Sequence, residues 1–579
     1  MPPARASSPP APGSFDRAVA LQRLRDEHFD VLVVGGGITG AGVALDAAAR
    51  GLRTALVERH DFASGTSSKS SKMVHGGLRY LQQRDFRLVY EALHERQRLL
   101  ENAPHLVAPL PFLIPLFGRD GVVNKGVARA YATALTLYDF TGGLRIGRRH
   151  RRIDRAEALA HLPTLRTDAL VAGFVYYDAR ADDARLTLTV ARTAALDHGA
   201  VVANHTEVTG VLADARGTVC GARVRPSAPG RPEAEEFEIR ATVVVNATGV
   251  WADQLGALAD PRHHRSIRPA KGIHVTVPRA RFPADIAAVI PVPKDRRSIF
   301  VVPWPDGDDV YLGTTDTDWD GSLDDPACLP DDVDYVISAA NGVVTSALTR
   351  ADVTGVWAGL RPLLAPADGH HVSARTADLS RRHRVTVGED GLVTVTGGKL
   401  TTYRRMAEDT VDAVVRRLGA GAPEGAHRCP TKRLALRGAQ GLEGLRRPAA
   451  PARFGVSDEA FAALVARHGG ETPAVLELAA GRRDLLDPLV PGLPQLRVEA
   501  LWAARHEMAL TVDDVLARRT RALLRRAAGA ADAAPGVAEL LAPTWGLDAK
   551  QAAGLAASFA ERARGDLVRA GLDPVRSAP

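Results

Sequence analysis

The sequence has few of the features that build disulfide, zinc and membrane-spanning structures. Only three of its 579 residues are cysteines, Cys220, Cys328 and Cys429, and without a CxxC pair they predict neither a disulfide framework nor a zinc site. Such cysteine usage fits a reducing cytoplasmic compartment. A run of about 18 apolar residues, which a membrane-spanning helix needs, is absent. The N-terminal "MPPARASSPPAPGSFDR" lacks the apolar core of a secretory signal.

Signals for nucleic-acid or metal binding are equally sparse. The formal net charge is +7, but no basic run is interleaved with aromatic residues, so we predict no nucleic-acid partner. A mild positive charge suits small anions or an acidic lipid surface, and it is also common on solvated surfaces. The segment "DTDWDG" at 316–321 begins like a calcium-binding loop, but its twelfth position is Ala327 where a glutamate is required. We therefore predict no metal site.

What the chain does contain is a dinucleotide-binding pattern at 30–58, "DVLVVGGGITGAGVALDAAARGLRTALVE". An apolar run suited to a buried parallel strand is followed by glycines at GxGxxG spacing, Gly35, Gly37 and Gly40. They allow a tight turn, close approach to a pyrophosphate and close helix packing, and the helix that follows directs free N–H groups at the phosphates. A second strand ends at Glu58, which can accept hydrogen bonds from an adenosine ribose. The pattern fits both NAD and FAD.

Two later glycine turns favour FAD. In "VVVNATGVW" at 243–251, an apolar strand runs into Thr248 and Gly249, where small residues let the backbone approach a bound dinucleotide. In "GLVTVTGGKLTTYRRMAED", a strand to Thr396 precedes the turn Gly397-Gly398, and a helix is expected from about Thr401. The start of that helix could stabilise the negative charge of a reduced flavin. The three elements predict one nucleotide domain assembled from separated segments.

At this level of detail the chain resembles a known family. The motifs "VVGGGITGAG", "TSSKSSKMVHGGLRYL", "NATGVWAD", "KGIHVTVP", "WAGLRPLL" and "TGGKLTTYR" occur in the order found in FAD-dependent, quinone-linked glycerol-3-phosphate dehydrogenases of the D-amino-acid-oxidase-like flavoprotein superfamily. The resemblance runs from about residue 29 to 525. It implies an α/β fold, in which a Rossmann-like FAD-binding domain carries an inserted β-rich substrate domain, plus a C-terminal α-helical domain.

The expected domain boundaries follow from this resemblance and from composition. Residues 1–28 are expected to be a disordered tail, and 29–429 the FAD-dependent oxidoreductase region. Its FAD-binding segments are expected at about 29–110, 190–260 and 385–420, with substrate-capping β-rich segments at about 160–240 and 262–390. Residues 430–579 are expected to form the helical domain, where Thr511 and Asp514 predict a capping box. The stretch 105–118, with its three prolines, is expected to be a buried loop.

The resemblance also assigns site residues. It implies catalytic roles for His75, Arg361 and Lys399, and substrate contacts for Arg79, Tyr80, His274 and Thr401. Guanidinium groups suit a phosphate because they offer paired donors and stay charged. Oxidation of an alcohol needs a base within about 3 Å of the hydroxyl, and His75, His274 and Lys399 are all candidates. The expected FAD contacts are Gly35, Gly37, Gly40, Glu58, Thr66, Ser67, Ser71, Gly76, Gly77, Leu78, Thr248, Gly249, Gly397, Gly398 and Thr402.

The implied function is oxidation of sn-glycerol 3-phosphate to dihydroxyacetone phosphate by hydride transfer to FAD, with electrons passed to a membrane quinone. A homodimer bound peripherally to the inner face of the cell membrane is expected, with 105–118 or a helix at 124–140 as the lipid contact. One alternative is an oxidase that uses oxygen. Such oxidases carry an insertion between the positions of Arg361 and Lys399, which here lie only 38 positions apart. The other alternative is a flavin-binding protein without this catalysis.

Overall fold

The apolar run before the glycine motif becomes a central strand of an eight-stranded sheet, here called the first sheet. The computed structural model describes residues 13–575 apart from 78–84, 119–124, 143–145, 232–233, 293–297, 366–380 and 448. The strand order is β17-β18-β10-β1-β2-β7, with β9 also paired to β10 and β8 to β9. The bounds are β1 His28–Val34, β2 Thr54–Val57, β7 Val201–Ala203, β8 Thr206–Ala213, β9 Val219–Pro226, β10 Phe237–Asn246, β17 His383–Val387 and β18 Val393–Gly397.

Both faces of the first sheet are covered, which explains why its central strand is apolar throughout. Val31 and Val33 of β1 pack against one group of helices, α2 (Ile38–Ala49), α7 (Asp183–His198) and α10 (Tyr403–Leu418). Leu32 and Val34 point to the opposite face, which is covered by β8, β9, α1 (Arg17–Asp26) and α8 (Ala252–Ala259). The parallel pairing of β10, β1 and β2 brings the ends of these strands to one edge, where the glycine turns lie.

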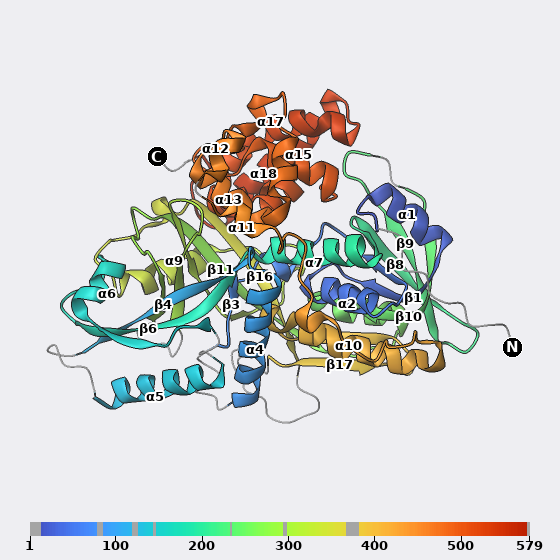
Figure 1. Ribbon diagram of the computed structural model, residues 1–579, viewed down its shortest axis with the longest axis horizontal. Coiled ribbons are helices and arrows are strands. Elements are labelled where there is room, and N and C mark those ends of the chain that lie inside the picture. The colour runs from blue at the N-terminus through green and yellow to red at the C-terminus, as the bar shows by residue number, and fades with distance from the viewer. Residues whose placement is uncertain are drawn as a thin grey trace.

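A second sheet of ten strands lies beside the first (Figure 1). Its order is β15-β11-β14-β13-β12-β4-β6-β3, with β16 paired to β11 and β5 to β6. The bounds are β3 Met73–Val74, β4 Val107–Phe117, β5 Arg151–Asp154, β6 Leu170–Ala181, β11 Ile267–Pro278, β12 Ala287–Pro291, β13 Ser298–Pro303, β14 Asp309–Gly313, β15 Thr317–Asp318 and β16 Gly355–Leu364.

Four helices accompany the second sheet within the described residues. α6 (Arg155–His161) and α9 (Pro330–Asn341) bury apolar side chains on the face shared with the C-terminal region. On the other face, α4 (Phe86–Asn102) and α5 (Lys125–Thr141) contribute Val89, Leu93, Leu135 and Tyr138 to a separate apolar cluster. The helix expected at 124–140 is therefore confirmed as α5, and it forms the outer layer at one end of the molecule (Figure 1).

The proline-rich stretch 105–118 is a strand, so the prediction of a loop is wrong. β4 pairs along its whole length with β6, and at Phe112 and Leu113 it also pairs with β12. The backbone nitrogens of successive residues alternate between the two edges of a strand. The three prolines all have odd residue numbers, Pro109, Pro111 and Pro115, so their nitrogens lie on the same edge. A missing N–H is tolerated there because the ladder on the opposite edge is unaffected.

The expected segment boundaries also need correction. Part of the tail expected at 1–28 is ordered, since α1 begins after Asp16, whose side chain accepts the Val19 N–H at 3.0 Å. Arg17 then donates to the carbonyls of Asn204 and His205 at 2.9 and 2.8 Å, which fixes this helix to the first sheet. Strands β7 to β10, expected partly in the capping sheet, belong to the first sheet, whereas β3 and β4 belong to the second.

The C-terminal region is helical, as expected, and it shares one apolar core with the second sheet. Ile273 and Val275 of β11 belong to the same cluster as Leu516 and Phe559 of the helical region. Among the described residues, no helix has both the length and the apolarity to cross a membrane. The helices are α11 Leu442–Leu445, α12 Ala450–Phe454, α13 Asp458–His468, α14 Thr472–Glu477, α15 Arg497–His506, α16 Ala522–Arg525, α17 Ala527–Trp545 and α18 Ala549–Arg569, with a π-helix at Asp514–Arg519.

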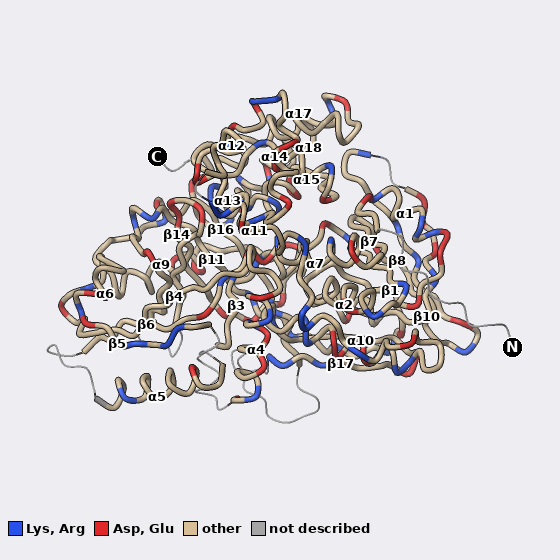
Figure 2. Tube along the Cα trace, in the orientation of Figure 1, with Lys and Arg blue, Asp and Glu red and all other residues tan. Residues whose placement is uncertain are grey.

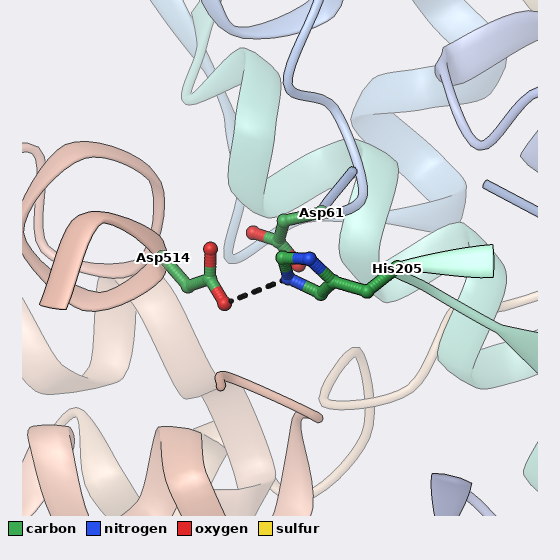
Figure 3. Close-up of side chains that lie close together, drawn as sticks. All are labelled: Asp61, His205 and Asp514. Atoms are coloured by element: carbon green, nitrogen blue, oxygen red, sulfur yellow. Dashed lines mark hydrogen bonds and ion pairs between the residues drawn. The ribbon is translucent and has the colours of Figure 1, made fainter. Parts of the chain in front are cut away.

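Buried ion pairs join the helical region to the first sheet. Asp61 is fully buried and accepts from Arg518 at 2.7 Å and from Arg519 at 2.6 and 2.9 Å. Figure 3 shows Asp61 beside His205 and Asp514, whose side chains are joined at 3.2 Å. The ligand atoms of these three residues lie within 4.8 Å of one another. Because two guanidinium groups already occupy the carboxylates, the cluster is an ion-pair junction rather than a cation site.

The same junction confirms the contacts of the capping box. Thr511 Oγ1 accepts the Asp514 N–H at 3.0 Å, and an Asp514 carboxylate oxygen accepts the Thr511 N–H at 3.1 Å. His205, Arg518 and Arg519 keep the pKa of Asp514 far below its usual value despite burial. Asp514 therefore both starts the π-helix and holds it against the first sheet.

We expect Asp61→Asn to destabilise the protein by about 3 kcal/mol, because removing one partner of a buried ion pair leaves uncompensated charge. The measurement is the midpoint of chemical unfolding at neutral pH. Asp168→Asn is the matched control, since Asp168 pairs with Arg166 on the surface and should leave the midpoint unchanged. Equal midpoints for both variants would show that the junction does not stabilise the fold.

Candidate functional site

A cavity of about 420 Å³ runs between the two sheets. At one end it is lined by Gly35, Gly37 and Glu58, and at the other by His75 and His274. Most of the predicted site residues come together around it, although they are spread from position 35 to position 401. They are Gly35, Gly37, Glu58, Thr66, Ser67, Ser71, His75, Thr248, Gly249, His274, Arg361, Gly397, Gly398, Lys399 and Thr401.

Other predicted residues lie behind the cavity wall or outside the described residues. A Cβ on Gly40 would sit 1.9 Å from the Gly35 carbonyl oxygen, so Gly40 permits helix packing. A Cβ on Gly76 would sit 2.7 Å from the Tyr138 hydroxyl, which already accepts the Gly76 N–H at 2.9 Å. Gly77 has a φ of +83°, and Thr402 directly precedes the first residue of α10. Leu78, Arg79 and Tyr80 lie outside the described residues.

The glycine end of the cavity is shaped by backbone that tolerates no side chain. Gly35 has a φ of +110°, and a Cβ there would lie 2.7 Å from the Ala247 carbonyl oxygen. Gly37 precedes the first residue of α2, whose N–H donates to Ser67 Oγ at 2.9 Å. Glu58 accepts from the Gly36 N–H at 2.6 Å and the His60 N–H at 2.8 Å. Burial raises the pKa of Glu58, and the two N–H groups oppose that rise.

The segment 64–77 connects this end of the cavity to the other. Thr66 Oγ1 donates to the Leu360 carbonyl at 2.6 Å, which joins the segment to β16 of the second sheet. Ser71 Oγ and His274 Nε2 are 2.9 Å apart. The His75 N–H donates to Thr401 Oγ1 at 3.2 Å, at the turn that leads into α10. One polar segment thus contacts two strands of the second sheet and the turn that leads into α10.

At the second end, Arg361 is held by a set of acceptors that sequence reasoning missed. Its guanidinium donates to Asp316 Oδ1 at 3.0 Å and to Thr314 Oγ1 at 3.1 Å. Arg381 lies 3.5 Å from the same Asp316 carboxylate and also lines the cavity. The available signal was the segment "DTDWDG" at 316–321, in which Asp316 was considered only as a calcium ligand. Asp316 orients two arginines instead.

The three candidate bases have lowered pKa values. Burial and the nearby cations Lys399 and Arg381 lower the pKa of His75 to about 3. Burial, with Lys72 and Arg361, holds the pKa of His274 well below its usual value. Burial, with Arg381, lowers the pKa of Lys399 to about 7. Near neutral pH both imidazoles are therefore uncharged proton acceptors, and Lys399 is close to its titration point.

The two histidines differ in their surroundings. His274 is 3% exposed, stacks on Trp357 with ring centroids 4.7 Å apart, and is engaged by Ser71. Lys72, also buried, lies 4.5 Å from the centre of the Trp357 ring. The His75 ring lines the cavity, and no hydrogen bond joins it to another described side chain. His75 is thus the more available to a ligand, whereas His274 is held in the wall.

Comparison with known proteins identifies the family. Residues 30–404 match the family described as FAD dependent oxidoreductase, and residues 429–552 match the C-terminal domain of alpha-glycerophosphate oxidase. The chain is 45% identical over 538 residues to glycerol-3-phosphate dehydrogenase 2 of Mycobacterium tuberculosis, covering 92% of this chain and 88% of that protein. The chain belongs to the FAD-dependent glycerol-3-phosphate dehydrogenase family.

More distant relatives agree with this assignment. The human mitochondrial glycerol-3-phosphate dehydrogenase is 36% identical over 544 residues, covering 90% of this chain and 71% of that protein. The structure of glycerol-3-phosphate dehydrogenase from Bacillus halodurans, complexed with FAD, superposes with a TM-score of 0.74 at 31% identity and covers 97% of this chain and 99% of that one. These relatives confirm the α/β fold with a C-terminal helical region and FAD as the cofactor of the family.

The residues of the cavity fit this cofactor. The turns at Gly35 and Gly37 leave room for a pyrophosphate at the start of α2, where backbone N–H groups and the helix dipole favour phosphate. Glu58 lies at the end of β2, where a carboxylate can accept ribose hydroxyls. Gly397 and Gly398, with φ values of +74° and +81°, form the turn before α10. The cavity thus has a hydrogen-bond acceptor for a ribose and N–H donors for a phosphate. At Gly397 and Gly398 it also has backbone without side chains, beside which a ring system can lie.

We expect Gly37→Val to give folded protein with little bound FAD. A Cβ at position 37 would lie only 3.2 Å from Ser67 Oγ, and a branched side chain would fill the space beside the first N–H groups of α2. The check is the ratio of flavin to protein absorbance after purification, with circular dichroism to verify folding. Gly536→Val, at an open position of α17, is the control. A normal flavin content in Gly37→Val would show that the FAD pyrophosphate does not bind at this turn.

Proposed function

We propose that the protein oxidises sn-glycerol 3-phosphate to dihydroxyacetone phosphate and passes the electrons to a membrane quinone. The observation that carries the proposal is the group of cations at one end of the FAD cavity, Arg361, Arg381 and Lys399, set beside two uncharged histidines. Relatives named glycerol-3-phosphate dehydrogenase support the same substrate. When bound, FAD supplies the two-electron acceptor for the hydrogen on C2.

In this proposal the cations hold the phosphate and His75 accepts the proton of the C2 hydroxyl. Arg361 is positioned for this because Asp316 and Thr314 occupy part of its guanidinium and fix its plane. A phosphate dianion near Lys399 and Arg381 offsets their mutual repulsion. His75 has an uncharged ring that faces the cavity, so its nitrogen can take the hydroxyl proton as the alcohol becomes a ketone. His274 supports the wall.

We expect Arg361→Lys to weaken the apparent affinity for glycerol 3-phosphate by about 1.5 to 3 kcal/mol, because a lysine keeps the charge but loses the paired donors. The measurement is anaerobic bleaching of the flavin absorbance, with glycerol as the matched substrate that has no phosphate. The relative loss should be smaller for glycerol. Failure of the wild-type flavin to bleach with glycerol 3-phosphate would contradict the proposed function, and equal losses for both alcohols would place Arg361 at the hydroxyl end.

We expect the KM for glycerol 3-phosphate to rise as the pH passes upward through about 7. The pKa of Lys399 is lowered to about 7, so its phosphate-binding charge is present below that pH and lost above it. The substrate phosphate becomes a dianion above about pH 6, so binding should be tightest between the two values. Lys399→Met should abolish the rise in KM that the wild type shows as the pH passes upward through about 7. A rate that instead increases through pH 7, and loses that increase in Lys399→Met, would make Lys399 the base.

Exposed apolar and basic groups on one end of the molecule support membrane contact. Phe140 and Leu137 of α5 are 73% and 38% exposed, and Phe86 and Tyr90 of α4 are 47% and 55% exposed. The run "RRHRR" at 148–152 leads into β5, and Figure 2 shows basic residues along β5 at the same end as α5. Apolar insertion combined with basic charge is the arrangement by which peripheral proteins bind acidic lipid surfaces. Quinone in the membrane would then lie close to the protein.

We expect the protein to co-sediment with anionic vesicles more strongly at low salt than at high salt, since each basic residue near the surface contributes about 1 kcal/mol that salt screens. Phe140→Ser should reduce the binding that persists at high salt, whereas Val568→Ser, another exposed apolar residue, should not. In parallel, reduced enzyme should be reoxidised faster by a quinone analogue than by oxygen. Absence of vesicle binding at low salt would show that this face does not contact the membrane. Faster reoxidation by oxygen than by the quinone analogue would favour the oxidase alternative.

A further inference from the structure

A second cavity of about 570 Å³ lies against the segment 64–69, close to the FAD cavity. Its other walls come from residues 323–328 of the region between β15 and α9, from β16, and from α18 of the C-terminal region. Ser64, Gly65, Thr66 and Lys69 line both cavities, so this short segment lies between them. The family resemblance and the proposed reaction assign nothing to the second cavity.

The charged groups that line this cavity are almost all paired with one another or with neighbours. Arg521 pairs with Asp183 at 2.5 Å, and the side chain of Trp251 donates to Asp324 at 2.8 Å. The remaining ion pairs are Arg518 with Asp61, Asp513 and Asp514, Arg562 with Asp513, Arg59 with Asp324, and Arg569 with Asp325 and Asp566. Each carboxylate of the lining therefore already has a cationic partner.

Lys69 is the exception. Within the described part of the chain, no hydrogen bond or ion pair reaches its ammonium group, although its backbone N–H donates to the Thr66 carbonyl at 3.1 Å. The charges that act on it most strongly are Arg518, Arg562, Asp566 and Asp325, all of which line the second cavity. None of the cations at the substrate end of the FAD cavity is among them. Lys69 thus lines both cavities, and the charged groups nearest its ammonium group belong to the second.

We propose that this second cavity binds an organic monocarboxylate with a short apolar body, held by Lys69. Lys69 is half-buried, and an ammonium group that loses part of its hydration without gaining a partner is destabilised, so an anion that pairs with it would offset that cost. The walls beside it include Leu323, Pro326, Leu555 and Phe559, which suit a hydrocarbon chain. The lowering of the pKa of Lys69 to about 8, caused chiefly by burial and by Arg518 and Arg562, agrees with an unmatched cation.

The charge balance selects a monoanion over a dianion. Only one positive charge is uncompensated, and Asp325 and Asp566 stand near it, so a second negative charge on the ligand would meet carboxylates rather than cations. The substrate end of the FAD cavity differs, because Arg361, Arg381 and Lys399 converge there and suit a phosphate dianion. The two cavities thus select anions of different charge.

A ligand on Lys69 would act on the segment that shapes the FAD cavity. A Cβ built on Gly359 of β16 would lie 2.7 Å from the Lys69 carbonyl oxygen, so residue 69 packs against β16. Two residues further on, Ser71 engages His274. Restraint of Lys69 by a carboxylate therefore reduces the freedom of residues that contact the cofactor and the active-site wall. The site has the position expected of an effector site.

The test is calorimetric titration of the FAD-loaded protein, without substrate, with octanoate as the probe. Octanol is the uncharged control and inorganic phosphate the dianionic one. We expect octanoate to bind more tightly than either, and Lys69→Met to weaken it by about tenfold or more, the effect of losing one partly buried charge-assisted contact. Lys69→Arg should retain binding. Ser558→Trp, which fills the cavity from an exposed position on α18, should block it without touching the charge.

Two results would overturn the proposal. Octanoate that does not bind, or binds equally to wild type, Lys69→Met and Ser558→Trp, would show that the cavity is not its site. Loss of FAD from Lys69→Met would instead make Lys69 a cofactor residue that faces the other cavity. Neither result depends on turnover of glycerol 3-phosphate, so failure of this proposal and failure of the proposed reaction are separately recognisable.

Discussion

A row of buried arginines near the end of the chain holds the parts of this protein together. Arg518 and Arg519 pair with Asp61 in the turn after β2 of the first sheet, Arg521 pairs with Asp183 at the start of α7, and Arg525 pairs with Asp309 of the second sheet. Each guanidinium is less than a tenth exposed. Charges buried this deeply are stable only with their partners, so the helical region, the first sheet and the second sheet must assemble in one arrangement.

This arrangement determines the geometry of the active site. Arg521 donates to the Ser68 carbonyl at 2.7 Å, and Asp183 also accepts from the Ser70 N–H at 3.0 Å and lies 3.5 Å from Lys72. The polar segment 64–77 thus receives its shape from the C-terminal region on one side and from Thr66 and Ser71 contacts on the other. The cofactor cavity and the second cavity lie on the two sides of that segment. The C-terminal helices, although far from the glycine motif in sequence, are part of the site.

Features with local causes could be predicted from the sequence alone. The glycine turns at 35–40 and 397–398 and the helix after Thr401 were predicted because backbone conformation and periodicity mark them directly. The strand β4 was not, because prolines favour loops, and whether the edge that carries their nitrogens can spare those hydrogen bonds depends on the neighbouring strand. The role of Asp316 was missed because its partners, Arg361 and Arg381, are distant in sequence. The pair Arg518–Asp61 spans 457 positions, and no local pattern encodes it.

The central claim is that the arginine row fixes the segment 64–77 from outside the FAD-binding sheet. Its most direct test is hydrogen exchange of backbone amides in the FAD-loaded protein, comparing wild type, Arg521→Met and Arg569→Met, the last of which loses only two surface ion pairs. Our account predicts that amides of residues 64–77 exchange about tenfold faster in Arg521→Met, because a charge-assisted contact of about 1.5 kcal/mol or more is lost, and that Arg569→Met leaves them unchanged. Faster exchange confined to residues 514–526, with the segment 64–77 as protected as in wild type, would contradict it.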